Sequence, residues 1–321
     1  MNTLKRMMVA LLALLPLATG MAIADTEHGY SRIFIFGASF MDSGNHFAVT
    51  GETAHPPFEP IDATYGIGGH RPTNGHTWVE RLAEEMELTR WAKPAYRNPV
   101  FGNYAFTYAR ARDPLPPEPD PLEPSLHDQV KDWDYNGYCT GDPDNRMYDT
   151  LFIVDSGYRD ALDLMNASSD AERNAIFQSW VGAIYANIVK LYECGAHNLM
   201  VAYLPDMAVP MVPPEGKDGA TAASMMFNYM LLGPAVDTFS EPPFNMNVST
   251  VDLFYYSTLL KGSKEAFGFT NTTDACITPY VTAGAICEDP DAYFWWDQLH
   301  PTKRVHALFA EFALGQLPVP D

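Results

Sequence analysis

Short apolar runs that favour β-strands alternate along this chain with segments of helical periodicity. The strand runs occupy residues 31–36, 150–154, 199–204 and 251–255. Helices are predicted at residues 76–87, 220–232 and 305–314, and a long one is expected between a cap at Asp170 and a stop at Gly195. This alternation predicts an α/β fold with a mostly parallel sheet that is covered by helices on both faces.

The first 24 residues have the layout of a secretory signal peptide. Lys5 and Arg6 precede an apolar run at residues 7–17, and small residues follow at 22–24. This run is too short to span a bilayer, so we expect a cleaved leader and a secreted or periplasmic protein without stable membrane insertion. An uncleaved anchor is the alternative. No sharp change of composition divides the rest, and residues 25–321 are predicted to form a single domain.

The mature chain is strongly acidic. Lys5 and Arg6 leave with the leader, so 20 − 2 = 18 basic residues face 40 acidic ones, a net charge of 18 − 40 = −22. Such a surface repels nucleic acid and anionic lipid, which excludes nucleic-acid partners.

Two segments are predicted to be loops: residues 50–73, which are rich in Gly, Pro and His, and the proline-dense residues 113–124.

Four cysteines remain after the leader, an even number in a chain that is expected to leave the reducing cytosol. Three pairings are open to four cysteines. We favour Cys276 with Cys287, which would close a short loop, and Cys139 with Cys194. No two of them have the close spacing of a zinc site, so no metal is expected.

A carboxylate and an imidazole stand three residues apart near the end of the chain. Asp297 and His300 lie just before Pro301, which prevents a helix from continuing, so the segment can fold back and bring the carboxylate to one ring nitrogen. Ser39 follows the first predicted strand, and the carboxyl ends of parallel strands are where such sheets place their chemistry. The contrasting interpretation is that Asp297 and His300 are ordinary loop residues and that Ser39 or Ser43 caps the next helix.

If these segments meet, their chemistry is that of a serine nucleophile. Ser39 needs a base to remove its proton, His300 can accept that proton and pass it to the leaving group, and Asp297 can orient the ring. This reaction requires neither a cofactor nor a metal. His306, shortly after His300, is predicted to be a packing or solvated residue.

The chain resembles the GDSL (SGNH) family of serine esterases and lipases, particularly its secreted bacterial and fungal branches. The resemblance covers nearly the whole mature length, in segments that keep the family's order: residues 36–39, 42–45, 73–75, 78–80, 102–105, 268–276, 287–296 and 297–302. It implies a flavodoxin-like three-layer α/β/α fold, no metal, and hydrolysis through an acyl-serine intermediate. It assigns Ser39 as the nucleophile, His300 as the base and Asp297 as its orienting carboxylate.

Three of the family's blocks are altered in this chain, and two of these changes concern oxyanion donors. Ala38 stands where the family has Asp, and Thr107 stands where a glycine amide helps to bind the oxyanion. The asparagine of the third block is missing, and Ser156, Gly157 or Arg159 takes its place. Ser39 still has its own amide, and Thr107 has one that can donate if the turn is kept, so these two residues are the predicted oxyanion donors.

Three functions are consistent with this pattern. The first is an exported hydrolase of carboxylic esters, of the lipid or acylated-sugar type. The second is a binding protein on the same fold that has lost catalysis, and the third is an acyltransferase. Trp295 and Trp296 would either wall the substrate site or support the loop from inside the protein.

Overall fold

The structure is a computed structural model that describes residues 28–51, 70–113, 123–142, 144–155, 157–277 and 286–318. The expected leader lies outside the described residues, as do most of the predicted loop at 50–73 and the greater part of the proline-dense segment at 113–124.

Four parallel strands form the main sheet. They are β1 (Arg32–Phe36), β2 (Met147–Asp155), β3 (Ala196–Ala202) and β4 (Asn247–Val251), in the order β1-β2-β3-β4. Residues 102–106 run parallel to β1 on its outer edge, where the Ile35 amide donates to the Gly102 carbonyl at 2.9 Å and the Tyr104 amide donates to the Ile35 carbonyl at 2.7 Å. With this segment counted, the order along the sheet is 2-1-3-4-5 in chain order, the flavodoxin-like arrangement. The predicted parallel α/β fold is confirmed.

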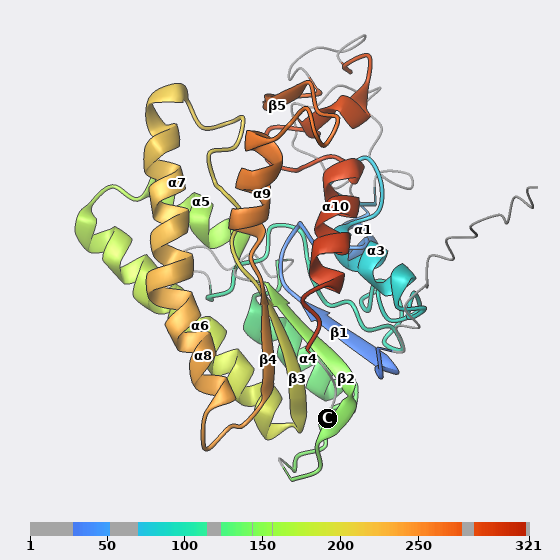
Figure 1. The fold of residues 1–321 in the computed structure, drawn as a ribbon. Helices are drawn as coiled ribbons and strands as arrows, with labels where there is room; N and C mark the ends of the chain where they lie inside the picture. The colour runs from blue at the N-terminus through green and yellow to red at the C-terminus, as the bar shows by residue number, and fades with distance from the viewer. Residues whose placement is uncertain are drawn as a thin grey trace, which may run out of the picture.

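Helices cover both faces of the sheet (Figure 1). α4 (Leu126–Tyr135) contacts β1, and α6 (Asp170–Glu193) contacts β3. α10 (Lys303–Leu314) packs against α3 (Trp78–Glu85) and α9 (Leu253–Gly262). The other helical elements of the described ranges are α1 (Asn45–Thr50), α5 (Tyr158–Asn166), α7 (Lys217–Met226), a π-helical turn (Phe227–Leu232), α8 (Gly233–Asp237) and short 3-10 turns at Pro214–Gly216, Thr238–Ser240 and Pro290–Ala292.

Aromatic side chains build the core between β1 and α4. The rings of Phe34 and Phe36, two residues apart on one face of the strand, lie 5.5 and 6.1 Å from the ring of Trp133. Phe152 of β2 meets the same indole at 5.7 Å. The apolar run that predicts β1 is therefore explained by burial on both faces, because Ile33 and Ile35 are fully buried too.

The prediction of a strand at residues 251–255 is wrong. β4 ends at Val251, and Asp252 caps α9 by accepting a hydrogen bond from the Tyr255 amide at 2.8 Å. A short apolar run fits a buried strand and a buried helix equally well, and here the capping carboxylate decides for the helix. A smaller correction concerns α6, where Ser169 is the cap and Asp170 is the first helical residue.

A small second sheet leads into the Asp297 segment. β5 (Asn271–Ala275) pairs in parallel with β6 (Tyr293–Trp295), and the Cys276 amide donates to the Trp295 carbonyl at 2.9 Å. Both favoured disulfides are present, Cys276–Cys287 beside this sheet and Cys139–Cys194 at the other end of the molecule.

Of the helices in the described ranges, none has the length and apolarity to cross a membrane.

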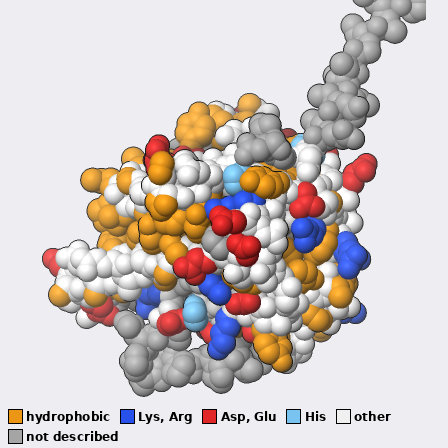
Figure 2. Space-filling view, turned by 90° about the horizontal axis from the view of Figure 1, so that it is seen from below, with side chains coloured by type: hydrophobic (Ala, Val, Ile, Leu, Met, Phe, Trp, Pro, Cys, Tyr) orange, Lys and Arg blue, Asp and Glu red, His pale blue; other side chains and the backbone are white. Residues whose placement is uncertain are grey.

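The Cys139–Cys194 disulfide lies where the main strands begin, since Cys194 is two residues before the start of β3 and the Met147 amide of β2 donates to the Gly195 carbonyl. Figure 2 looks onto this lower end of the molecule, where charged side chains of both signs spread over the middle and right and hydrophobic side chains gather on the left. The disulfide is therefore remote from the carboxyl ends of the strands.

Replacing both Cys139 and Cys194 by Ser is expected to lower the free energy of unfolding by about 2–4 kcal/mol, because the bond closes a long loop of the unfolded chain. Denaturant unfolding of the variant and the parent measures this. An unchanged unfolding free energy would show that the bond does not restrict the unfolded chain.

Candidate active site

Ser39 lies in a tight turn directly after β1. The side chain of Asp155, at the end of β2, accepts a hydrogen bond from the Ala38 amide at 3.0 Å, and Gln129 holds Gly37 through two bonds at 2.8 and 3.0 Å. A Cβ atom on Gly37 would lie 2.3 Å from the Cβ of Asp155, so only glycine fits between the strands here. The turn is thereby fixed at the carboxyl edge of the sheet.

Asp42 organises the loop after Ser39. Its buried carboxylate accepts hydrogen bonds from the amides of Gly44, Asn45 and His46 at 2.6–3.2 Å. It also accepts from both the amide and the hydroxyl of Thr107, each at 2.7 Å. The structure therefore gives the Thr107 amide a structural bond in place of the oxyanion role predicted from the sequence, because an amide has only one proton to donate.

Two buried asparagines connect this loop to the edge segment at 102–106. Asn45 donates to the carbonyls of Asn103 and Ala105, both at 2.7 Å, and accepts from the Tyr96 amide at 3.0 Å. Asn103 donates to the Met41 carbonyl at 2.8 Å. These residues belong to the sequence segments that carry the family resemblance, and in the structure they satisfy loop backbone groups that would otherwise be buried without partners.

Asp297 and His300 are in contact, as the sequence predicts. The two carboxylate oxygens of Asp297 lie 3.0 and 2.9 Å from Nδ1 of His300. One of these oxygens also accepts from the amides of Leu299 and His300, at 2.8 and 2.7 Å. Both side chains are buried, so the carboxylate holds the ring with Nδ1 inward.

Neighbouring segments hold the loop around His300 in place. The Trp296 amide donates to the His300 carbonyl at 2.8 Å, and the Thr73 hydroxyl donates to the Pro301 carbonyl at 2.7 Å. The side chain of Asn74 accepts from the Lys303 amide at 2.7 Å. Trp295 and Trp296 are each only 2% exposed, so they support the loop from inside and do not wall an open site.

The Ser39 turn and the His300 loop meet through aromatic packing. The ring of Phe40, next to Ser39, lies 6.1 Å from the ring of His300 and 4.7 Å from that of Tyr158. Tyr158 in turn donates to the Leu299 carbonyl at 2.9 Å. Within the described ranges, no hydrogen bond is made by the Ser39 amide, the Ser39 hydroxyl or Nε2 of His300. The three groups that acyl transfer would use are thus uncommitted.

Burial changes the ionisation of two residues beside this site. It raises the pKa of Tyr158 well above its usual value, and the nearby Asp297 charge adds to this effect. Burial also lowers the pKa of His306 to about 3, with a smaller contribution from His300. Nδ1 of His306 accepts from the Trp78 amide at 3.2 Å, so this ring is a neutral packing residue between helices.

The segment that replaces the third oxyanion block is also packed tightly. Gly157 has a φ of +88°, and a Cβ there would lie 2.6 Å from both Asp160 and Trp180. Arg159 is part of the wall of a large cleft, and Ser156 lies outside the described residues. Burial raises the pKa of Asp160 to about 7, although Arg112 lies 3.0 Å away.

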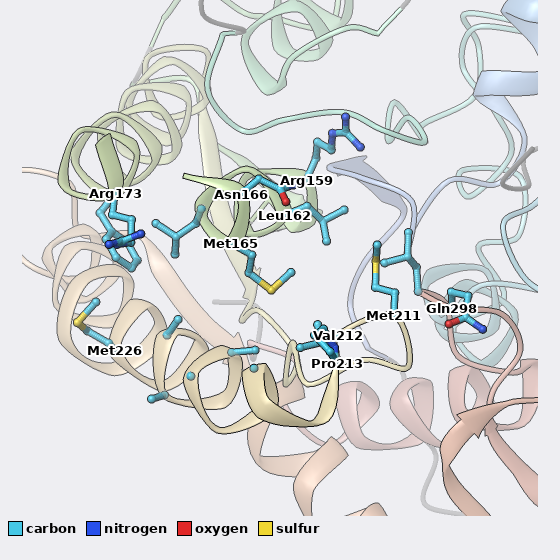
Figure 3. A pocket seen from close by; sticks show the side chains of 18 of the residues that line it. Arg159, Leu162, Met165, Asn166, Arg173, Met211, Val212, Pro213, Met226 and Gln298 are labelled. Atoms are coloured by element: carbon cyan, nitrogen blue, oxygen red, sulfur yellow. The ribbon is translucent and has the colours of Figure 1, made fainter. Parts of the chain in front are cut away.

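A cleft of about 1230 Å³ opens beside the Asp297–His300 loop. Figure 3 shows Gln298 and Met211 at one end and Arg173 and Met226 at the other, with Met165 projecting between them. The walls come from α5, α6, α7 and the residues before α7, together with Tyr108, Glu123, Gln298 and Leu299. No sequence pattern singled out this cleft, because each helix contributes only a few apolar residues that alone suggest ordinary packing.

A model of the family described as GDSL-like Lipase/Acylhydrolase matches residues 33–313 of this sequence. The chain belongs to the GDSL-like lipase/acylhydrolase family. The match spans both the Ser39 turn and the Asp297–His300 loop, so the whole candidate site lies within the family domain.

Curated relatives in this family are distant in sequence. One GDSL esterase/lipase of Arabidopsis thaliana is 24% identical over 330 residues, covering 88% of this chain and 81% of the relative. Another from the same plant is 23% identical over 314 residues, covering 88% and 86%. A crystal structure of the lipase/acylhydrolase from Enterococcus faecalis aligns with 10% identity and a TM-score of 0.40, over 89% of this chain and 97% of that one. The expected bacterial or fungal branch of the GDSL family stays a prediction.

Replacing Asp42 by Asn is expected to lower the free energy of unfolding by about 3 kcal/mol, because an amide cannot accept all the hydrogen bonds that the buried carboxylate receives. The control is Thr107→Val, which removes a single hydroxyl bond and should cost about 1 kcal/mol. Denaturant unfolding measures both. If both variants lose the same free energy of unfolding, the several hydrogen bonds to Asp42 do not stabilise this GDSL-family loop more than the single Thr107 hydroxyl bond does.

His306 makes stability depend on pH. Its folded pKa of about 3 lies below its usual 6.5, so the unfolded chain binds a proton in this range that the folded protein does not. Stability is therefore lost as pH falls from 6.5 toward 3, by about 2 kcal/mol at pH 5. His306→Asn keeps an acceptor for the Trp78 amide. Between pH 7 and pH 5, its free energy of unfolding in urea should fall by about 2 kcal/mol less than that of the parent. Equal losses in parent and variant would refute this.

Proposed function

We propose that this GDSL-family protein is an exported serine hydrolase that cleaves carboxylic esters through an acyl-serine intermediate. Ser39 is the nucleophile, His300 the base, and Asp297 the residue that orients His300. The observation that carries the proposal is the buried contact of Asp297 with Nδ1 of His300, which leaves Nε2 without a hydrogen-bond partner in the described structure. The packing of Phe40 near His300 supports the approach of Ser39 to that nitrogen.

In the first step, the Ser39 hydroxyl oxygen attacks the ester carbonyl carbon while Nε2 of His300 takes the hydroxyl proton. The tetrahedral intermediate collapses as that proton passes to the leaving alcohol oxygen and the carbon–oxygen bond of the alcohol breaks. Water then attacks the acyl-serine, with His300 again accepting and returning a proton, and the carboxylic acid is released. Asp297 stabilises the positive charge that His300 carries in both halves of the reaction.

Of the two oxyanion donors predicted from the sequence, only the Ser39 amide is available to the tetrahedral intermediates. The Thr107 amide donates to Asp42 at 2.7 Å. Loss of one oxyanion donor typically costs about 100- to 1000-fold in turnover. We therefore expect a slower hydrolase than a family member with all donors in place.

Export is the second part of the proposal. It rests on the leader pattern of residues 1–24 and is supported by two disulfides, which persist in oxidising compartments. The leader and the disulfides are independent features of the chain, and both agree with an extracellular or periplasmic protein.

Ser39→Ala is expected to abolish hydrolysis of a short chromogenic ester and labelling by a fluorophosphonate, because it removes the proposed nucleophile. The matched control is Ser43→Ala in the same loop, whose hydroxyl is buried and has no hydrogen-bond partner in the described chain, and it should keep the parent rate within about threefold. Asp297→Asn should lower kcat by about 10⁴-fold.

Steady-state kinetics and intact-mass analysis of the labelled protein check these expectations. A folded parent that neither hydrolyses the ester nor takes the label would overturn the proposal and leave a binding protein on the same fold. A labelled parent whose acyl product appears on an added alcohol, with little free acid, would replace hydrolysis by acyl transfer.

A further inference from the structure

We propose that the cleft between α5 and α7 binds the acyl chain of the ester, and that the chain is long, unbranched and of about twelve carbons or more. This rests on the proposed function, because the carbonyl end must reach Ser39. It narrows the substrate from esters in general to long-chain acyl esters, and it assigns the acyl portion, not the alcohol, to the cleft.

The cleft is continuous with the loop that carries the proposed base. Gln298 and Leu299, the two residues between Asp297 and His300, belong to its wall. The Met211 amide donates to the Gln298 carbonyl at 3.2 Å, so the segment before α7 is attached to the same loop. A chain lying in the cleft therefore has one end beside the loop that carries His300.

The cleft wall has the chemistry of a hydrocarbon site. Leu162 and Met165 come from α5, Phe177 from α6, and Met226 from α7. Figure 3 shows Leu162 and Met165 projecting into the space between these helices. Glu123, Arg159, Asn166, Arg173 and Gln298 also line the cleft, but most of the lining residues are apolar. Methionine and leucine side chains adapt to a flexible hydrocarbon chain.

The size of the cleft agrees with a long chain. Residues 216–226 of the α7 wall span ten helical steps, about 15 Å, which is about the extended length of a twelve-carbon chain. A methylene group is about as large as a water molecule, roughly 30 Å³, so the cleft holds on the order of forty such groups. A short acyl group would leave most of this apolar surface in water.

Glycine on α7 keeps the cleft open. Gly219 lines it, and a Cβ built on this residue has no atom within 4 Å. A large side chain at this position fits the helix but occupies the cleft. Gly182 on α6 is likewise exposed, has the same free space around its Cβ, and does not line the cleft, so it provides a matched control.

The experiment is a series of acetyl, butyryl, octanoyl, dodecanoyl and hexadecanoyl esters of one alcohol, hydrolysed by the parent, Gly219→Phe and Gly182→Phe. In the parent, kcat/KM should rise with chain length up to dodecanoyl, by at most about fourfold per methylene when burial is complete. Gly219→Phe should lose at least tenfold on the dodecanoyl ester and keep its rate on the acetyl ester. Gly182→Phe should match the parent throughout.

Binding of dodecanoate to Ser39→Ala protein, measured by calorimetry, tests the cleft without catalysis. It should be lost in the double variant Ser39→Ala/Gly219→Phe and kept in Ser39→Ala/Gly182→Phe. Hydrolysis that is flat with chain length, or a Gly219→Phe profile equal to that of Gly182→Phe, overturns the acyl site while the hydrolase proposal stands. If the parent shows neither hydrolysis nor fluorophosphonate labelling, the proposed function is overturned. In that case, dodecanoate binding that is lost in Gly219→Phe would still support the cleft as a site for acyl chains.

Discussion

The buried carboxylate of Asp42 is the interaction on which the arrangement of the candidate site depends. A charge enclosed in this way is stable only if hydrogen bonds replace its water, and here the donors come from the loop after Ser39 and from Thr107. Thr107 follows the edge segment at 102–106, which pairs with β1. The carboxylate therefore joins the two chain segments that border Ser39 and keeps their backbone from relaxing independently.

The same network explains the altered oxyanion block. A glycine in place of Thr107 could not donate a hydroxyl proton to Asp42, whereas threonine donates both an amide and a hydroxyl to the same carboxylate oxygen. Threonine thus strengthens the connection between the loops and commits the amide that could otherwise face the substrate. The amide proton of Thr107 can either stabilise the loop by bonding to Asp42 or stabilise an oxyanion, but it cannot do both at once.

The sequence predicts the features that depend on local pattern. β1 follows from a run that is apolar on both faces, α6 from its long helical stripe, and the contact of Asp297 with His300 from a spacing of three residues before a proline. The start of α9 was missed because a five-residue apolar run has no period of its own, and the deciding group was the capping carboxylate of Asp252. The commitment of Thr107 to Asp42 could not be predicted either, since it depends on how two segments 65 residues apart meet.

The cleft shows why substrate choice is harder to read than the reacting residues. Ser39, His300 and Asp297 each have a side chain whose chemistry suggests a role, and the fold only has to bring them together. The cleft that we propose as the acyl site is instead a space lined in part by small residues such as Gly219, and no sequence pattern predicts such a space. Because Gln298 and Leu299 belong both to the loop of the base and to the wall of the cleft, a change in the bound chain acts on the segment that positions His300. Acyl-chain recognition and orientation of the base would then share one short loop.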